Sequence, residues 1–219
     1  MSGTVGVICD LAARYSSFTE CLARMHSPAN TAVEFGKGAD RSVNRNHVVR
    51  QALSYGSEWV LFLDDDHSFP PTLLTRLLSH GQPVVASLYL RRAAPFHPIA
   101  YGARDETGAY LPVDLTGCGP AELVPVVGAG TGGMLIRSEV FRALEDPWFV
   151  HTTEKSEDLS FCEKALEVGF PLFVDTGARL GHIAPAETFP AFENGQWCAG
   201  LNFAASTRVL LPLDLGATP

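Results

Sequence analysis

The strongest constraint on the fold is a run of five apolar residues that ends abruptly in three aspartates. Residues 59–63 (WVLFL) carry no charged side chain, and Asp64, Asp65, Asp66 and His67 follow at once. The run is too short for a typical helix before its acidic stop, so it predicts a fully buried strand. A chain with such a strand needs elements that cover the strand on both faces.

Strand and helix patterns alternate along the first half of the chain. Two further apolar runs predict strands at residues 4–9 and 84–89. Helices are predicted between the strands, over residues 40–54 and 68–80, with Asp40 as an N-cap and Gly56 and Gly81 after the helix ends. The alternation predicts an α/β fold with a mostly parallel sheet flanked by helices.

The second half begins with a change in composition. Residues 91–127 are dense in proline and glycine, and the short strand candidates at 98–101 and 109–113 predict a β-hairpin insertion. Helices near 138–144 and 156–169 and a strand at 171–174 would complete the domain. We therefore predict one domain over residues 1–183, with the insertion near 91–127, and a C-terminal tail (184–219) that packs on the same domain.

Composition excludes several classes of protein. No apolar run is long enough for a membrane span, and no basic stretch followed by an apolar one begins the chain, so a cytoplasmic protein is expected. The five cysteines form no C-x-x-C pair, which argues against a disulfide framework or a thiolate zinc site. The net charge of −8 disfavours a large polyanionic partner without excluding a local basic patch.

The aspartate cluster is the strongest chemical signal. In open α/β sheets, ligands bind beyond the carboxyl ends of the strands, where these residues would lie. Adjacent carboxylates repel one another unless a cation compensates, and oxygen ligands suit Mg²⁺ or Mn²⁺. Asp64 and Asp66 would point the same way in an extended segment, one toward a metal and the other toward a sugar or ribose. The alternative is a solvated acidic turn that caps the next helix.

Two segments further along could join this site. His182 follows Gly181, and its imidazole could complete a metal shell, although a lone histidine is more often structural. Glu157 and Asp158 follow Ser156. Either Ser156 caps a helix whose dipole the two acids complement, or one carboxylate is a general base.

Two other segments carry weaker signals. The glycine run at 128–133 lacks the lysine of a phosphate-binding P-loop, and a tight turn that brings backbone close to a ligand fits it better. Arg45 and Asn46, on the helix before the acidic strand, would face either a nucleotide or solvent.

Taken in order, these segments resemble the GT-A glycosyltransferases, especially small phage and bacterial ones. Residues 59–67 resemble the D-x-D region, and Arg45-Asn46 the R-N pair before it. Residues 130–136 resemble the glycine-rich strand that backs the sugar and acceptor pocket. Residues 157–169 resemble the E-D helix, and residues 180–182 the metal-binding histidine segment. The resemblance covers residues 4–183, and these segments in order are more specific than the D-x-D motif alone.

The resemblance implies a GT-A fold and an enzyme that uses a nucleotide-diphosphate sugar, often UDP-linked, with Mn²⁺ or Mg²⁺. It implies that Asp158, next to Glu157, is the base of an inverting displacement, and that Asp66, Asp64 and His182 hold the metal. The donor side would comprise Asp64, Asp65, Arg45, Asn46, Gly132 and Gly133. The third aspartate and His67 depart from the common pattern and leave open which carboxylate binds the metal.

The acceptor and two other reaction classes stay open. A hydroxymethylated DNA base of a phage is one candidate acceptor, with Arg91, Arg92, Arg104 and His97 as its path, alongside glycans, proteins and small molecules. A metal-dependent nucleotidyltransferase or phosphohydrolase would also place carboxylates after a strand. A non-catalytic module that binds nucleotide sugars would use the same donor residues.

Overall fold

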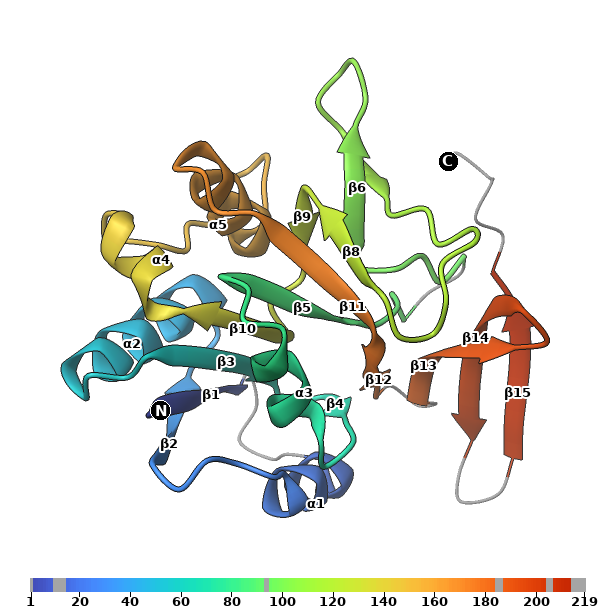
Figure 1. The fold of residues 1–219 in the computed structure, drawn as a ribbon, viewed down its shortest axis with the longest axis horizontal. Coiled ribbons are helices and arrows are strands. Elements are labelled where there is room, and N and C mark those ends of the chain that lie inside the picture. The colour runs from blue at the N-terminus through green and yellow to red at the C-terminus, as the bar shows by residue number, and fades with distance from the viewer. Residues whose placement is uncertain (1, 10–14, 93–94, 184–186, 204–206, 214–219) are drawn as a thin grey trace.

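A seven-stranded sheet forms the centre of the computed structural model (Figure 1). The structure describes the chain except residues 1, 10–14, 93–94, 184–186, 204–206 and 214–219. The strand order is β2-β1-β3-β10-β5-β11-β8. Five strands run in one direction: β1 (Gly3–Cys9), β2 (Thr31–Lys37), β3 (Trp59–Asp64), β5 (Val84–Leu88) and β11 (Leu172–Arg179). Two strands run the other way, β8 (Leu123–Val126) and β10 (Gly133–Arg137).

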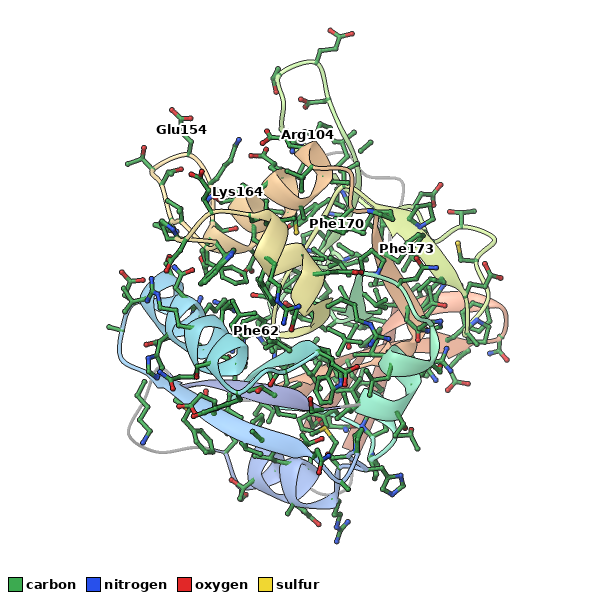
Figure 2. The ribbon with its side chains drawn as sticks, turned by 60° about the vertical axis from the view of Figure 1, so that its left-hand side comes forward. Phe62, Arg104, Glu154, Lys164, Phe170 and Phe173 are labelled. Carbon is green, nitrogen blue, oxygen red and sulfur yellow. The ribbon has the colours of Figure 1, made fainter. Side chains whose placement is uncertain are left out.

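Helices cover both faces of this sheet, as the apolar strands require. Side chains of α2 (Arg41–Ser54), α4 (Ser138–Ala143) and α5 (Glu157–Glu167) share one hydrophobic cluster with Val60 and Phe62 of β3. Side chains of α1 (Ser16–Arg24) and α3 (Leu73–Ser79) share another with Leu61 and Leu63. Successive strand residues therefore serve opposite faces. Figure 2 shows Phe62 in the interior, on the α2 side of the sheet.

Two smaller sheets adjoin the central one. The insertion contributes β6 (Ala100–Arg104) and β7 (Tyr110–Pro112), which pair with β9 (Gly128–Ala129). The other sheet has the order β15-β14-β13-β12-β4, from Thr207–Pro212, Gln196–Phe203, Glu187–Glu193, Gly181–His182 and His67–Ser68. Trp197, Ala199 and Leu213 belong to the same hydrophobic cluster as α2 and α5.

The α/β fold, with a mostly parallel sheet flanked by helices, is confirmed, and the local structure differs from the sequence pattern at four points. The helix predicted over 68–80 begins only at Leu73, because His67 and Ser68 pair with β12 and two prolines follow. Strand β8, for which the sequence predicted no candidate, pairs with β11 in the central sheet. Asp65 and Asp66 form a turn and do not continue the extended strand. Ser156 precedes α5, but its side chain makes no capping hydrogen bond.

The termini of α2 agree with the sequence prediction. The Asp40 side chain accepts a hydrogen bond from the backbone N–H of Val43 at 3.1 Å, as an N-cap does. Gly56, just beyond the helix, has a φ of +69°. Among the helices described, none is long and apolar enough to span a membrane.

Candidate functional site

Chemically active side chains gather at the carboxyl edge of the parallel strands. Asp64 ends β3, and Asp66 and His67 come just after it. Tyr89 and Arg92 follow β5, and His182 follows β11. The opposite direction of β10 brings the turn at its start, with Thr131 and Gly132, to the same edge. Segments far apart in the sequence thus meet where open α/β sheets bind ligands.

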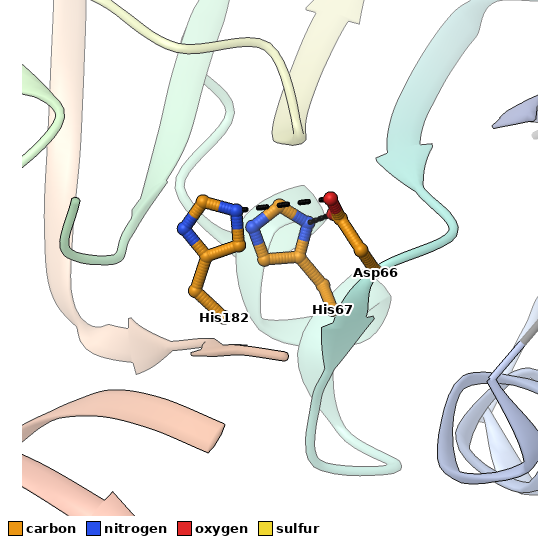
Figure 3. A group of neighbouring side chains, drawn as sticks. All are labelled: Asp66, His67 and His182. Carbon is orange, nitrogen blue, oxygen red and sulfur yellow. Dashed lines mark ion pairs between the residues drawn. The ribbon is translucent and has the colours of Figure 1, made fainter. Parts of the chain in front are cut away.

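Asp66, His67 and His182 form a compact group of potential metal ligands (Figure 3). One ligand atom from each lies within 4.8 Å of the others. Asp66 Oδ1 is 3.3 Å from His67 Nδ1, and Asp66 Oδ2 is 3.8 Å from His182 Nε2. The two imidazoles stack with their centroids 4.6 Å apart. Strand pairing sets this arrangement, because His67 lies directly opposite His182 between β4 and β12.

The surroundings of both histidines favour the neutral, metal-binding form. Burial lowers the pKa of His67 well below its usual value, and His182 and Arg45 lower it further. Burial also lowers the pKa of His182, and Arg92 adds to this effect. His182 Nδ1 lies 2.9 Å from the Leu90 carbonyl oxygen. A carbonyl only accepts, so Nδ1 carries the proton and the Nε2 lone pair faces Asp66.

The environment of His67 suits a metal ligand. The side chain is 1% exposed, and neither ring nitrogen has a hydrogen-bond partner of good geometry among the described residues. A buried polar group without a partner is costly. A bound divalent cation would satisfy one of these nitrogens, so the donor set fits a metal such as Mn²⁺.

Arg45 joins three carboxylates beside this group. Its side chain is buried and donates to Glu157 Oε1 at 2.6 Å and to Asp64 Oδ1 at 3.0 Å. Its Nη2 also lies 3.6 Å from Asp158 Oδ1. Burial alone would lower the pKa of Arg45, but the three acids raise it above its usual value, so the guanidinium stays charged.

Asp158 is held from two sides at the first turn of α5. The Thr131 hydroxyl donates to Asp158 Oδ1 at 2.6 Å, and Arg45 lies on the same oxygen. The carboxylate is about one-fifth exposed, with a side-chain exposure of 22%. It is therefore both oriented and open to a ligand. Glu157 is more buried, and one of its carboxylate oxygens accepts a hydrogen bond from Arg45.

Gly132 brings backbone against the site. A Cβ at this position would come within 2.6 Å of His67 Cε1 and 2.9 Å of Asp64 Oδ2. The Gly132 N–H donates to the Tyr89 hydroxyl at 3.3 Å. Burial raises the pKa of Tyr89 well above its usual value, with Asp158 and Asp64 adding to it, so the phenol keeps its proton. Gly133 packs on Leu180 and Ser87 in the same tight approach.

An open pocket of about 400 Å³ lies over these groups. Its lining combines acids, histidines and arginines: Asp64, Asp66, Asp158, His67, His182, Tyr89, Ile99, Arg41, Arg91 and Arg92. A larger hollow of about 710 Å³ lies elsewhere, between residues 114–122 and Trp197. We place the functional site in the smaller pocket because the metal-ligand group and the oriented carboxylate line it.

The other predicted residues differ in whether they line this pocket. Asn46 is buried, and its amide exchanges two hydrogen bonds with the backbone of Phe149. The Asp65 backbone N–H donates to the Ile8 carbonyl. Of the residues proposed for a DNA path, Arg91 and Arg92 line the pocket, whereas Arg104 pairs with Glu163 of α5 at 2.6 Å.

Sequence reasoning missed several residues of the pocket. His67 was noted without a role, and Tyr89, Thr131 and Arg41 were not singled out. The position of His67 directly after Asp66 in the sequence was a usable signal for His67, because both residue types bind metals. Tyr89 and Thr131 gave no local signal, since their position depends on how β5 and β10 pair.

The architecture matches solved structures at low sequence identity. A197 from STIV superposes with a TM-score of 0.60 at 14% identity, over 96% of this chain and 94% of that chain. GalNAc-T7, solved with UDP, GalNAc and Mn²⁺, superposes with a TM-score of 0.61 at 14% identity. That match covers 84% of this chain but only 44% of GalNAc-T7. A scan of protein-family models and a search of curated proteins find no match.

These likenesses concern the fold. Nearly the whole chain superposes on A197, and the part shared with GalNAc-T7 is less than half of that protein. The chain therefore has a GT-A-like fold, with a compact group of two histidines and one aspartate at the carboxyl edge of its sheet.

Proposed function

We propose that this chain is a metal-dependent glycosyltransferase that moves a sugar from a nucleotide-diphosphate sugar, such as a UDP-sugar, to an acceptor hydroxyl. The observation that carries the proposal is the Asp66–His67–His182 group, which shares one pocket with the oriented carboxylate of Asp158. The GT-A-like fold supports it, and the neighbour GalNAc-T7 was solved with UDP and Mn²⁺.

The proposed metal ligands are Asp66, His182 and His67. Mn²⁺ or Mg²⁺ held there would neutralise the charge that develops on the departing diphosphate. The carboxylate supplies a hard oxygen donor, and the two neutral imidazoles favour Mn²⁺ over Mg²⁺. Asp64, anchored by Arg45, would contact the ribose or sugar of the donor.

Asp158 is the proposed general base. Thr131 and Arg45 hold one carboxylate oxygen of Asp158. The other carboxylate oxygen would accept the proton of the acceptor hydroxyl while the hydroxyl oxygen attacks the anomeric carbon. Attack on the face opposite the leaving diphosphate would invert the anomeric centre. Glu157 would position Arg45 and through it the base.

The acceptor is the least constrained part of the proposal. Arg91 at the pocket rim would suit an anionic acceptor such as a hydroxymethylated base in phage DNA. The net charge of −8 weighs against a large polyanion, so glycans, proteins and small molecules stay in the acceptor screen.

A thermal-shift screen of nucleotide sugars with and without Mn²⁺ tests the donor. A ligand that binds the native state raises the melting temperature by mass action. We expect a shift with a UDP-sugar plus Mn²⁺ that is lost in Asp66→Asn and His182→Ala. An unchanged shift in both variants would exclude the metal assignment.

Product analysis tests the reaction class. Transfer requires the sugar to appear on an acceptor, and Asp158→Asn should abolish it while leaving donor binding intact. Release of nucleotide, with no sugar transferred to an acceptor and no free sugar formed by transfer to water, would favour a phosphohydrolase instead. Wild-type transfer by Asp158→Asn would rule out Asp158 as the base.

A further inference from the structure

Arg92 contacts the carboxylate that the proposed metal needs. Its Nη2 pairs with Asp66 Oδ2, the oxygen that also faces His182 Nε2. The Arg92 side chain is 42% exposed, whereas Asp66 is 22% exposed. A long, half-exposed side chain therefore holds a ligand of the metal site.

The charges around Asp66 explain why a cation is needed there. Asp64 and Asp158 line the same pocket, and their negative charges disfavour another unpaired carboxylate. Arg45 is already shared among Asp64, Glu157 and Asp158. Arg92 thus neutralises Asp66 in the metal-free protein.

A divalent cation at the same carboxylate would conflict with this ion pair. The metal and the guanidinium are like charges that compete for one oxygen, and their repulsion at close range favours only one of them. The Arg92 side chain is exposed enough to move away from Asp66. Arg41 and Arg91 line the same pocket, so the space over the metal group is bordered by three guanidinium groups.

Guanidinium groups are well matched to phosphate, because their fork donates two parallel hydrogen bonds to anionic oxygens. A diphosphate bound over the metal would place such oxygens within the pocket that Arg92 borders. We propose that Arg92 exchanges partners, from Asp66 in the metal-free protein to the donor diphosphate when the metal takes Asp66. Arg92 is therefore a diphosphate-binding residue that couples metal binding to nucleotide binding.

This inference rests on the proposed function, and it makes a reciprocal prediction. Removing Arg92 frees Asp66, so the metal alone binds more tightly, while the nucleotide loses a contact and binds more weakly. By linkage, the factor by which UDP tightens Mn²⁺ binding equals the factor by which Mn²⁺ tightens UDP binding. That factor should fall toward one without Arg92.

The experiment measures free Mn²⁺ by electron paramagnetic resonance, first with protein alone and then with saturating UDP. Arg92→Met keeps the length of the side chain and removes its charge. We expect Arg92→Met to bind Mn²⁺ alone severalfold more tightly than wild type, as loss of a competing surface ion pair allows. Its affinity for UDP at saturating Mn²⁺ should fall about tenfold, as loss of a charged hydrogen bond predicts.

Two variants act as controls. Arg50→Met removes another exposed Arg–Asp pair, with Asp146, and should change neither affinity. Arg92→Lys keeps the charge and should retain weak binding of Mn²⁺ alone but only part of the UDP affinity, because lysine lacks the fork. In the presence of Mn²⁺, Arg92→Met should lose affinity for pyrophosphate by the same factor as it loses affinity for UDP. This result would assign the Arg92 contact to the diphosphate.

The outcomes separate this inference from the proposed function. If wild type binds Mn²⁺ and UDP together and Arg92→Met leaves both affinities unchanged, the exchange is wrong and the proposed donor site stands. If wild type binds no UDP at saturating Mn²⁺, the proposed donor and the diphosphate role of Arg92 both fail. The measurement with Mn²⁺ alone still decides whether Arg92 competes for Asp66.

Discussion

Arg45 illustrates how one side chain connects distant parts of the site. Its acidic partners come from β3 and the start of α5, and the sequence separation to Glu157 is 112 residues. The sequence placed Arg45 correctly on a helix before the acidic strand. It could not reveal that the helix turns this residue inward, because the ion pairs depend on how α2 and α5 meet the sheet.

We predict that Arg45→Met destabilises the protein more than any loss of a surface pair. Removing the cation leaves Asp64, Glu157 and Asp158 facing one another without compensation, at a cost of about 3 kcal/mol. Urea unfolding of Arg45→Met and Arg50→Met measures the difference. The exposed pair of Arg50 and Asp146 should contribute only about 0–1 kcal/mol. Equal losses would mean that Arg45 does not organise the acids.

The buried carboxylate of Asp175 makes the free energy of unfolding depend on pH. It accepts hydrogen bonds from Arg76 at 2.6 and 2.7 Å and lies 2.7 Å from His80 Nε2. Burial alone would raise its pKa, but Arg76, His80 and the Gly177 N–H together lower it. The group therefore contributes stability above its unfolded pKa, and this contribution is lost as pH falls through the lower native pKa.

We expect Asp175→Asn to lose about 1.5–3 kcal/mol at pH 7, as loss of charged hydrogen bonds predicts. Below about pH 4 the difference from wild type should shrink, since the carboxyl of the unfolded chain gains a proton there, whereas the native carboxyl gains one only at lower pH. Denaturant unfolding of both proteins across this range tests the sign. A difference that stays constant from pH 7 to pH 3 would contradict it.

At the scale of elements, local pattern predicted what local chemistry determines. The apolar run at 59–63 became β3, and the Asp40 cap and Gly56 bound α2 as expected. The predicted start of α3 was wrong because His67 and Ser68 form a strand that pairs with β12, more than 100 residues later in the sequence. The pairing of β8 with β11 is likewise a long-range choice that no local pattern encodes.

The same limit applies to the site. The sequence predicted Asp66 and His182 as metal ligands from their residue types, and the structure places them close together. The proposed role of His67 could be inferred only from the pairing of β4 with β12, which stacks the two imidazoles. Tyr89 and Thr131 joined the site through the antiparallel insertion of β10 between β3 and β5.

The turn before β10 gives a prediction about an element. We expect Gly132→Ala to weaken Mn²⁺ binding at least tenfold, because the new methyl group would overlap His67 and Asp64. Calorimetric titration of Mn²⁺ measures this change. Gly102→Ala is the matched control, since its nearest contact would be an ordinary 3.4 Å to Val113. Equal binding by the two variants would mean that the turn does not shape the site.

At the scale of the molecule, the C-terminal strands extend the core. Trp197 of β14 is 3% exposed, packs edge-on against Phe192 at 5.2 Å and shares the hydrophobic cluster of α2 and α5. A segment that buries its largest side chain in this cluster should unfold together with the central sheet. The pairing of β12 with β4 links the same strands to the metal group.

We therefore predict that Trp197→Ala destabilises the whole molecule by about 3–5 kcal/mol while unfolding stays a single transition. Leu210→Ala, at a half-exposed position on the neighbouring strand, should cost far less, because little apolar surface is lost from the core. Calorimetry and far-ultraviolet circular dichroism should report coincident transitions for both variants. Two transitions, with the larger one at the wild-type temperature, would show instead that β13–β15 fold as a separate unit, and the metal group would then depend on the central sheet alone.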